Sequence, residues 1–230
     1  MSQDQEIRGF TLLELLVVIV IISVVSAVGY PKFTSWKKDR EVRYAAEKVA
    51  NLITNISTQA QRGSYPFVQF YIKPSTAKDP DGTAKKVEFI TKGQTTEKYN
   101  SNLNKGIQPT CSTAANSGVF DNNEFDKYDS EDEKISIQIS DVGTVCFSQN
   151  GKYFERAGNM SSNQKLKIEG TTETRNYVII CSKDSAAKTS KKKCARTKGE
   201  GLEKPAYLVE WSRFGNISKF KWSGSDWTRQ

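Results

Sequence analysis

One apolar segment near the N-terminus restricts the fold of this chain more than any other feature. Residues 10–27 read FTLLELLVVIVIISVVSA and carry a single charge, that of Glu14. A helix over residues 10–29 would be about 30 Å long at ~1.5 Å per residue, which matches the apolar core of a bilayer. Because the segment is apolar on every face, it is not typical of a surface helix. We therefore predict a transmembrane segment at residues 10–29.

A secretory signal peptide is the alternative for such a segment, and its flanks argue against it. The preceding residues, MSQDQEIRG, contain Asp4, Glu6 and Arg8, a net charge of −1 rather than a basic region. No small-residue cleavage pattern follows, because Pro31 and Trp36 come soon after the apolar run. The flanks favour a segment that stays attached to the chain.

The junction RGFTLLE resembles the prepilin cleavage site of type IV pilins and type II secretion pseudopilins. In that site a short polar leader ends in glycine, and a phenylalanine then opens an apolar helix. The resemblance implies a leader peptide at residues 1–9, cleavage between Gly9 and Phe10 by a prepilin peptidase, and N-methylation of Phe10. It covers the leader and about thirty residues beyond it.

Three further residues match the assembly features of these proteins. Glu14 lies four positions beyond the new N-terminus, and Gly29 and Pro31 match the glycine and proline that loosen the helix near its membrane exit. A carboxylate inside an apolar helix is costly and usually needs a partner. In a polymer the amine of a neighbour's Phe10 would supply that partner; the alternative is an acid tolerated near the membrane surface.

Beyond Pro31 the helix pattern becomes amphipathic. Apolar residues recur at three- and four-residue steps, while Gly63 and Pro66 end the pattern. The apolar stripe consists of Val42, Ala46, Val49, Ile53, Ile56 and Ala60. We predict one long helix over residues 10–62, bent at Gly29–Pro31 because a mid-helix proline removes a hydrogen-bond donor.

The remaining residues, 63–230, are typical of a β-rich globular domain. Asn150-Gly151 is a hairpin signal, and Phe214-Gly215-Asn216 predicts a second turn. Strands are predicted at 66–72, 86–91, 134–140, 144–148, 165–169, 175–181, 206–211 and 216–222. The fold class is therefore α+β, with the stripe of the long helix packed on one or two antiparallel sheets.

The order of leader, long helix and β domain, with the turns VCFSQNGKYFE and VEWSRFGNI, is similar to GspH/FimT-type minor pilins, including the FimU and FimT groups. This resemblance is less specific than the N-terminal one, since phenylalanine–glycine turns are common in β proteins.

Four cysteines, Cys111, Cys146, Cys181 and Cys194, lie in the β-rich region. Disulfides are expected in an exported domain, although buried free thiols are the alternative. Of the three connectivities we prefer neighbour pairing, Cys111–Cys146 and Cys181–Cys194. A zinc site is not expected, because the chain has no CxxC pair and no histidine.

Two charge blocks of opposite sign stand out. Residues 121–133 carry seven acids and one base, and residues 183–198 carry seven bases and one acid. The acidic block lacks the EF-hand arrangement of calcium ligands, so we interpret it as a solvated loop. The two blocks are also candidates to contact each other, within or between subunits.

The basic block has two interpretations, a solubilising loop or a surface for DNA phosphates. We favour the solubilising loop. Because some FimT-like minor pilins bind DNA, the resemblance keeps the second interpretation open, but their glycine-arginine-x-arginine signature is missing. Trp222 and Trp227 would add stacking surfaces if they are exposed. The candidate DNA-binding residues are Lys188, Lys191, Lys192, Lys193, Arg196 and Lys198.

The absence of histidine argues against enzymes, because it removes histidine-based catalysis and metal sites. No cofactor and no metal is predicted. The expected function is that of a minor type IV pilin, with a type II secretion pseudopilin or a pilus-displayed DNA receptor as alternatives. The expected partners are other pilins, prepilin peptidase and the inner membrane, with non-specific DNA as a further one. The β domain would be periplasmic before the subunit joins a pilus or pseudopilus, which could reach the cell surface.

Overall fold

The structure analysed is a computed structural model that forms two compact units, Met1–Lys38 and Asp39–Gln230, described separately below. It describes residues 11–106, 124–129, 137–140, 143–150, 153–154, 166, 168, 176–212 and 214–230.

The first unit contains the first part of one long helix, α1 (Leu12–Gln61). The helix begins after Thr11, whose Oγ1 accepts a hydrogen bond from the Glu14 backbone N–H at 3.2 Å. The large apolar side chains from Leu12 to Val25 are 45% to 84% exposed. These side chains therefore contact little within their own unit.

The length and hydropathy of α1 bear on whether it could span a membrane. Among the described residues no single helix meets the length and hydropathy of a span, but Leu12–Ala27 and Lys32–Gln61, joined by a bend, meet them together. The backbone is helical through residues 28–31 as well. The bend between Leu12–Ala27 and Lys32–Gln61 falls at these residues, where a bend at Gly29–Pro31 was predicted. The predicted helix over residues 10–62 is thus found with ends at Leu12 and Gln61.

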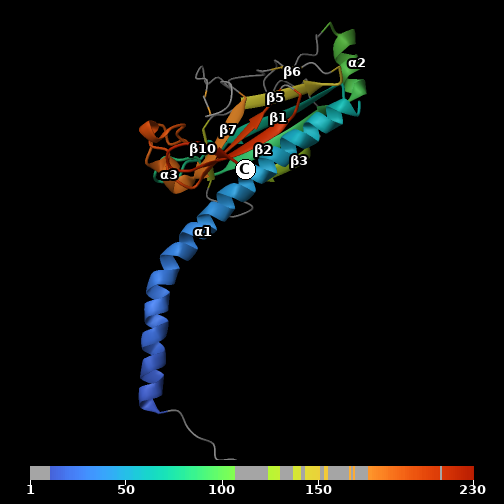
Figure 1. Cartoon of the computed structure of the whole chain (residues 1–230). Helices are drawn as coiled ribbons and strands as arrows, with labels where there is room; N and C mark the ends of the chain where they lie inside the picture. Colours follow the sequence, from blue (N-terminus) through green and yellow to red (C-terminus); the bar gives the residue numbers. More distant parts are fainter. Residues whose placement is uncertain are drawn as a thin grey trace, which may run out of the picture. The chain divides into compact units, whose positions relative to one another are not determined.

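The second unit contains the rest of α1, and there the apolar stripe is buried. All six predicted stripe residues, from Val42 to Ala60, are at most 2% exposed. The helix ends where Gly63 adopts a φ of +73°, and its N–H donates to the Ala60 carbonyl at 3.0 Å. Figure 1 shows this part of α1, in cyan, lying along the strands.

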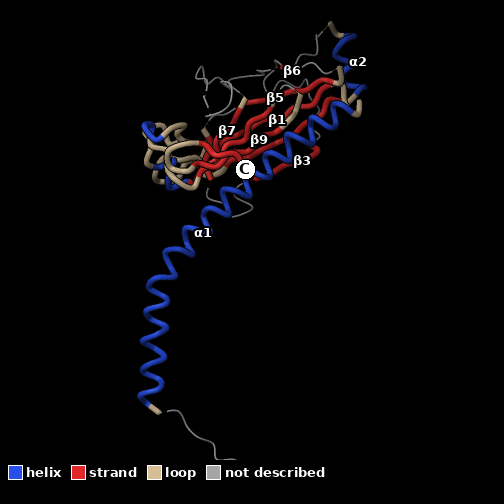
Figure 2. The backbone as a smooth tube through the Cα atoms, viewed as in Figure 1, coloured by secondary structure: helices blue, strands red, loops and turns tan. Residues whose placement is uncertain are grey.

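The described strands of the second unit form two antiparallel sheets, each with five strands. Figure 2 shows the strands in red. The first sheet has the order β3-β2-β1-β5-β6. Its strands are β1 (Phe67–Pro74), β2 (Val87–Gln94), β3 (Glu124–Asp129), β5 (Gly143–Ser148) and β6 (Tyr153–Phe154).

The second sheet has the order β10-β9-β8-β7-β4. Its strands are β4 (Ile137–Ile139), β7 (Tyr177–Ser182), β8 (Ala206–Trp211), β9 (Ile217–Trp222) and β10 (Trp227–Arg229). Three short helices complete the described part of the fold: α2 (Thr96–Asn104), α3 (Lys183–Ala187) and the 3-10 helix η1 (Lys198–Glu200).

The helix stripe and both sheets share one hydrophobic core. Its largest fully buried members include Phe70 of β1, Phe89 of β2 and Trp211 of β8. Phe70 and Phe89 stack with their ring centroids 6.4 Å apart. The α+β architecture predicted from sequence, with the helix stripe on antiparallel sheets, is confirmed.

A second hydrophobic cluster covers the other face of the second sheet. Alternate residues of β7 divide between the two clusters: Val178 and Ile180 join the first, and Ile179 and Cys181 join the second. Because β7 is covered on both faces, all six of its residues are buried. This explains why its sequence is a continuous apolar run rather than an alternating one.

The strands beside the first predicted turn are paired, although Gly151 lies outside the described residues, and the second predicted turn is present. In the first, β5 and β6 pair across Asn150-Gly151, with Cys146 opposite Phe154. In the second, Gly215 takes a φ of +82° and its N–H donates to the Ser212 carbonyl at 3.0 Å. Of the strand predicted at 165–169 only Leu166 and Ile168 are described, and both are buried.

The interpretation of the acidic block as a solvated loop is wrong for its central part. Residues Glu124–Asp129 form β3, whose backbone pairs antiparallel with β2 at the edge of the first sheet. An edge strand needs only one hydrogen-bonded neighbour, and charged residues are common on such strands. The acidic composition of these residues therefore did not predict a strand, because the strand is stabilised by backbone pairing with β2.

Candidate functional site

The predicted processing site lies at the N-terminal end of the chain. Gly9 and Phe10 are outside the described residues. Glu14 lies in the first turn of α1, and its side chain is exposed. A carboxylate in the first turn interacts favourably with the helix dipole, but it is surrounded in sequence by apolar residues. It is therefore placed where a positive group from outside its unit could reach it.

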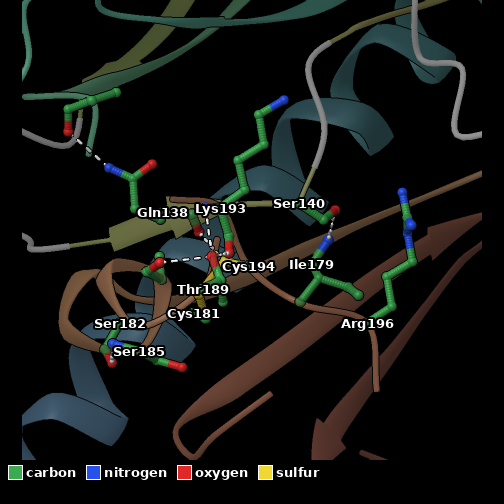
Figure 3. Close-up of a disulfide and its surroundings, with 12 residues drawn as sticks. Gln138, Ser140, Ile179, Cys181, Ser182, Ser185, Thr189, Lys193, Cys194 and Arg196 are labelled. Carbon is green, nitrogen blue, oxygen red and sulfur yellow. Dashed lines mark hydrogen bonds between the residues drawn. A yellow bond between two sulfur atoms is a disulfide. The ribbon is translucent and has the colours of Figure 1, made fainter. Parts of the chain in front are cut away.

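The second candidate site is a loop closed by a disulfide between Cys181, near the end of β7, and Cys194 (Figure 3). The predicted Cys181–Cys194 pairing is present in the structure. Cys146 is also disulfide-bonded. Its preferred partner, Cys111, is outside the described residues, so that pairing stays a prediction.

Hydrogen bonds connect residues within the loop and join the loop to β4. The Ser182 Oγ caps α3 by accepting from the Ser185 N–H, and the Thr189 Oγ1 donates to the Ala186 carbonyl at 2.8 Å. The Cys194 N–H donates to the Ile139 carbonyl of β4 at 3.1 Å. Figure 3 shows Ser182, Ser185 and Thr189 near the disulfide. The basic loop is therefore an ordered part of the second cluster, not a free extension.

The six predicted DNA-binding cations differ in their surroundings. Lys188 forms an ion pair with Glu203 at 2.8 Å, and this hydrogen bond raises the pKa of the lysine. The Lys192 ammonium turns back and donates to the Ala187 carbonyl at 2.6 Å. Two of the six are thus engaged within the loop's own surroundings.

Acidic side chains near the loop reduce its positive field. Lys183 pairs with Asp79 in the turn between β1 and β2. The carboxylate of Asp81 in the same turn accepts from the Thr83 hydroxyl and N–H, which lower its pKa, and Lys183 and Lys192 contribute further. The sequence block of seven bases is therefore partly balanced by acids that are distant in sequence.

The remaining cations border two pockets. A pocket of about 470 Å³ is lined by Lys191, Lys193 and Arg196, with Glu200 on its wall. A second pocket of about 250 Å³ is lined by Arg196 and Lys198 beside the C-terminal strands. The backbone N–H of Arg196 donates to the Glu200 carboxylate at 3.1 Å, which holds an acid beside these cations.

The two tryptophans proposed as stacking surfaces are not exposed, so that interpretation is wrong. Trp222 is 3% and Trp227 is 7% exposed, and their ring centroids lie 5.2 Å apart. The Trp227 indole N–H donates to the Arg196 carbonyl at 3.4 Å. They bury apolar area in the second cluster and expose little surface on which a base could stack.

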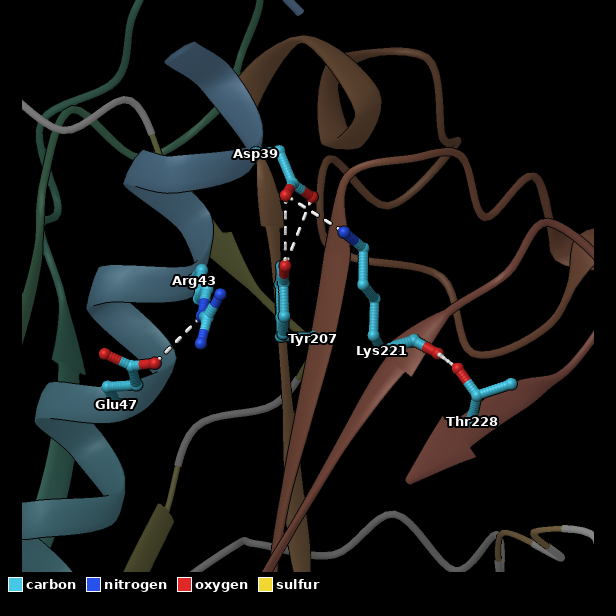
Figure 4. A network of polar contacts seen from close by, with 6 residues as sticks. All are labelled: Asp39, Arg43, Glu47, Tyr207, Lys221 and Thr228. Carbon is cyan, nitrogen blue, oxygen red and sulfur yellow. Dashed lines mark hydrogen bonds and ion pairs between the residues drawn. The ribbon is translucent and has the colours of Figure 1, made fainter. Parts of the chain in front are cut away.

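A polar network that sequence reasoning missed joins α1 to the second sheet (Figure 4). The Asp39 carboxylate accepts from the Lys221 ammonium at 2.9 Å and from the Tyr207 hydroxyl at 3.2 Å. The ion pair to Asp39 raises the pKa of Lys221, and burial raises the pKa of Tyr207.

A sequence signal for this network exists. Asp39 precedes Val42 by three residues, a spacing that places it beside the buried stripe rather than on the outer face. An acid at such a position indicates a partner across the core boundary.

Among the described residues, no three His, Cys, Asp or Glu side chains gather closely enough to hold a metal ion.

Comparison with known proteins identifies one motif. The family model of the prokaryotic N-terminal methylation motif matches residues 6–30, which include the junction at Gly9–Phe10 and Glu14. No curated protein and no solved structure significantly matches the chain. The motif implies processing by a prepilin peptidase and assembly with other pilins. Together with the helix and antiparallel sheets, it supports a type IV pilin-like protein.

Proposed function

We propose that this chain is a minor type IV pilin of the GspH/FimT kind, a structural subunit that primes or joins a pilus. The observation that carries the proposal is the methylation motif at residues 6–30, which leads directly into a long helix and an antiparallel β domain. The subunit is held in the inner membrane by the first part of α1, with the β domain in the periplasm, before it enters the filament.

The exposed first part of α1 explains why assembly follows. Its large apolar side chains need an apolar environment, which lipid supplies before assembly and the helices of neighbouring subunits supply afterwards. Glu14 then pairs with the positive N-terminal amine of a neighbour's Phe10, because an unpaired carboxylate in such surroundings costs a few kcal/mol. The mechanism is assembly rather than catalysis.

Processing and assembly are tested by separate measurements. Mass spectrometry of the mature protein should find Phe10 as a methylated N-terminus, with residues 1–9 removed. The Glu14→Leu variant should be processed normally and yet be missing from sheared filaments. Glu97→Leu is the matched control, because Glu97 is also an exposed acid in the first turn of a helix, α2. Normal incorporation of Glu14→Leu would overturn the proposed role.

A type II secretion pseudopilin shares the same N-terminal features and is the structural alternative. Deleting the gene and scoring piliation, twitching and secretion in the same strain separates the two functions. Loss of piliation and twitching with normal secretion supports the pilus. Loss of secretion with normal piliation assigns the chain to the secretion system.

A pilus-displayed DNA receptor is a second candidate, and it rests on three exposed lysines: Lys191, Lys193 and Lys198. The nearby acids and the buried tryptophans weaken it. A salt series measures the phosphate contacts, because binding through them falls steeply with ionic strength. Salt-dependent binding that is lost in Lys191→Glu/Lys193→Glu supports the receptor; equal binding by the variant and the parent excludes this loop.

A further inference from the structure

The segment of α1 that follows the apolar run has exposed aromatic side chains. Within the first unit, Tyr30, Phe33 and Trp36 are 72%, 59% and 55% exposed. The rings of Phe33 and Trp36 lie 5.9 Å apart at a tilt of 34°. Large aromatic residues so exposed on one helix indicate a surface that another phase or molecule covers.

The same segment is positively charged. Residues 29–38 read GYPKFTSWKK, with three lysines and no acid. Lys32 and Lys37 are exposed. At about 100° per residue, these two lysines and the three aromatic residues fall within an arc of about 160° on the helix. Aromatic rings and ammonium groups therefore share one face.

Tyrosine, tryptophan and lysine side chains favour the region where a bilayer meets water. Tyrosine and tryptophan concentrate where a bilayer meets water, since their rings are apolar with a polar edge. Lysine stems extend along apolar surface so that the ammonium reaches the headgroups. Each lysine near an anionic membrane strengthens binding about fivefold.

We propose that residues 30–38 form an interfacial collar that binds the headgroups of anionic phospholipids in the leaflet that faces the β domain. The collar rests on the proposed membrane anchoring by the preceding apolar residues, with which it is continuous. A second copy of the same segment is a poor occupant, because two sets of three lysines would repel each other, whereas phosphate headgroups neutralise them.

The four tryptophans make the collar directly measurable. Trp36 is 55% exposed, while Trp211, Trp222 and Trp227 are 1%, 3% and 7% exposed, so quenchers in lipid reach Trp36 selectively. The full chain is reconstituted in phosphatidylcholine vesicles that contain a minority of phosphatidylglycerol, with bromine on one lipid or the other. Bromine is placed either near the headgroup or near the chain end, and flotation measures anchoring in the same samples.

We expect bromine near the headgroup to quench Trp36 more than bromine at the chain end. Brominated phosphatidylglycerol should quench about twice as strongly as brominated phosphatidylcholine at equal mole fraction, because the lysines enrich it locally. Trp36→Phe should lose this quenching, which verifies the reporter. Lys32→Gln/Lys37→Gln should lose the lipid preference, while the equal charge change Lys191→Gln/Lys193→Gln in the β domain should keep it.

The result that overturns the collar is equal quenching by the two lipids, or deeper quenching at the chain end, in protein that floats with the vesicles. That outcome leaves the membrane anchor intact. Protein that fails to float overturns the anchor itself, and the collar with it.

Discussion

Gly215 is the residue at which one added methyl group should cost the most. Its φ of +82° is a backbone conformation that side-chain-bearing residues rarely adopt. A Cβ atom built there would lie 1.9 Å from the Ser57 Oγ of α1, far inside van der Waals contact. The glycine thus permits both the turn after β8 and the close approach of the helix.

Gly215→Ala should therefore lower the free energy of unfolding by about 2–4 kcal/mol, from backbone strain and overpacking together. Gly201→Ala is the control, because Gly201 has a φ of +91° with nothing within 4 Å of the added Cβ. It should lose only the backbone contribution, about 1 kcal/mol. Urea unfolding of the full chain in detergent, followed by tryptophan fluorescence, gives both values. Equal losses would show that the contact with Ser57 is relieved without cost.

The ion pair between Asp39 and Lys221 is half-exposed, with side chains 32% and 36% accessible. A double-mutant cycle with Asp39→Asn and Lys221→Gln should give a coupling free energy of about 0.5–1 kcal/mol, the range of solvent-screened pairs. Salt should reduce the coupling further. A coupling of zero at low salt would mean that the pair orients the side chains without stabilising the fold.

The stability that this network contributes should fall at high pH. The pKa values of Lys221 and Tyr207 are raised above their ordinary values of 10.5 and 10.0. A raised pKa contributes stability that is complete below the unfolded value and is lost as pH rises through the folded value. The stability difference between the parent and Asp39→Asn should be constant from neutral pH to about 10 and should shrink above it. Unfolding curves measured across that range test it.

At the scale of elements, α1 places more residues in the shared core than any single described strand does. Ile53 is fully buried among residues of this helix and the sheets. Ile53→Ala should destabilise the β domain by about 2–5 kcal/mol, since it removes buried methyl groups and leaves a cavity. Ile21→Ala is the matched control, because Ile21 is 56% exposed in the first unit, and it should leave the unfolding transition unchanged. A similar loss in both variants would contradict the assignment of the core.

The Cys181–Cys194 disulfide closes a loop with a sequence separation of 13 between two buried sulfurs. The variant Cys181→Ala/Cys194→Ala should lose about 3 kcal/mol, the chain-entropy value for a loop of this length. Limited proteolysis should then cut within residues 183–198 first. Unchanged stability and an intact loop would mean that the hydrogen bonds around Thr189 suffice to hold it.

At the scale of the whole molecule, every buried hydrophobic residue in the described part of the chain lies at Val42 or beyond. The second unit, Asp39–Gln230, should therefore fold without residues 1–38. A fragment that starts at Asp39 should show the near-UV circular dichroism and the urea midpoint of the full chain. A lower midpoint would show that residues 1–38 stabilise the domain.

Much of this fold follows from local pattern. The helix stripe is predictable from its three- and four-residue spacing, and both turns are predictable from their glycines. The central strands β1, β2, β5, β7, β8 and β9 are predictable from alternation or from enrichment in β-branched and aromatic residues. The strand β3 and the helix α2 are not, since their sequences are polar and their stability comes from pairing and capping.

The sequence by itself determined the N-terminal motif, the apolar helix and the α+β class, because these depend on residue type and local spacing alone. Only the tertiary structure decided that the lysine loop lies near Asp79, Asp81 and Glu203, that Trp222 and Trp227 are buried, and that Asp39 joins α1 to the second sheet. Those outcomes depend on which distant segments meet. The contacts of a charged or aromatic side chain depend on residues far away in sequence, so the pattern of its own segment does not predict them.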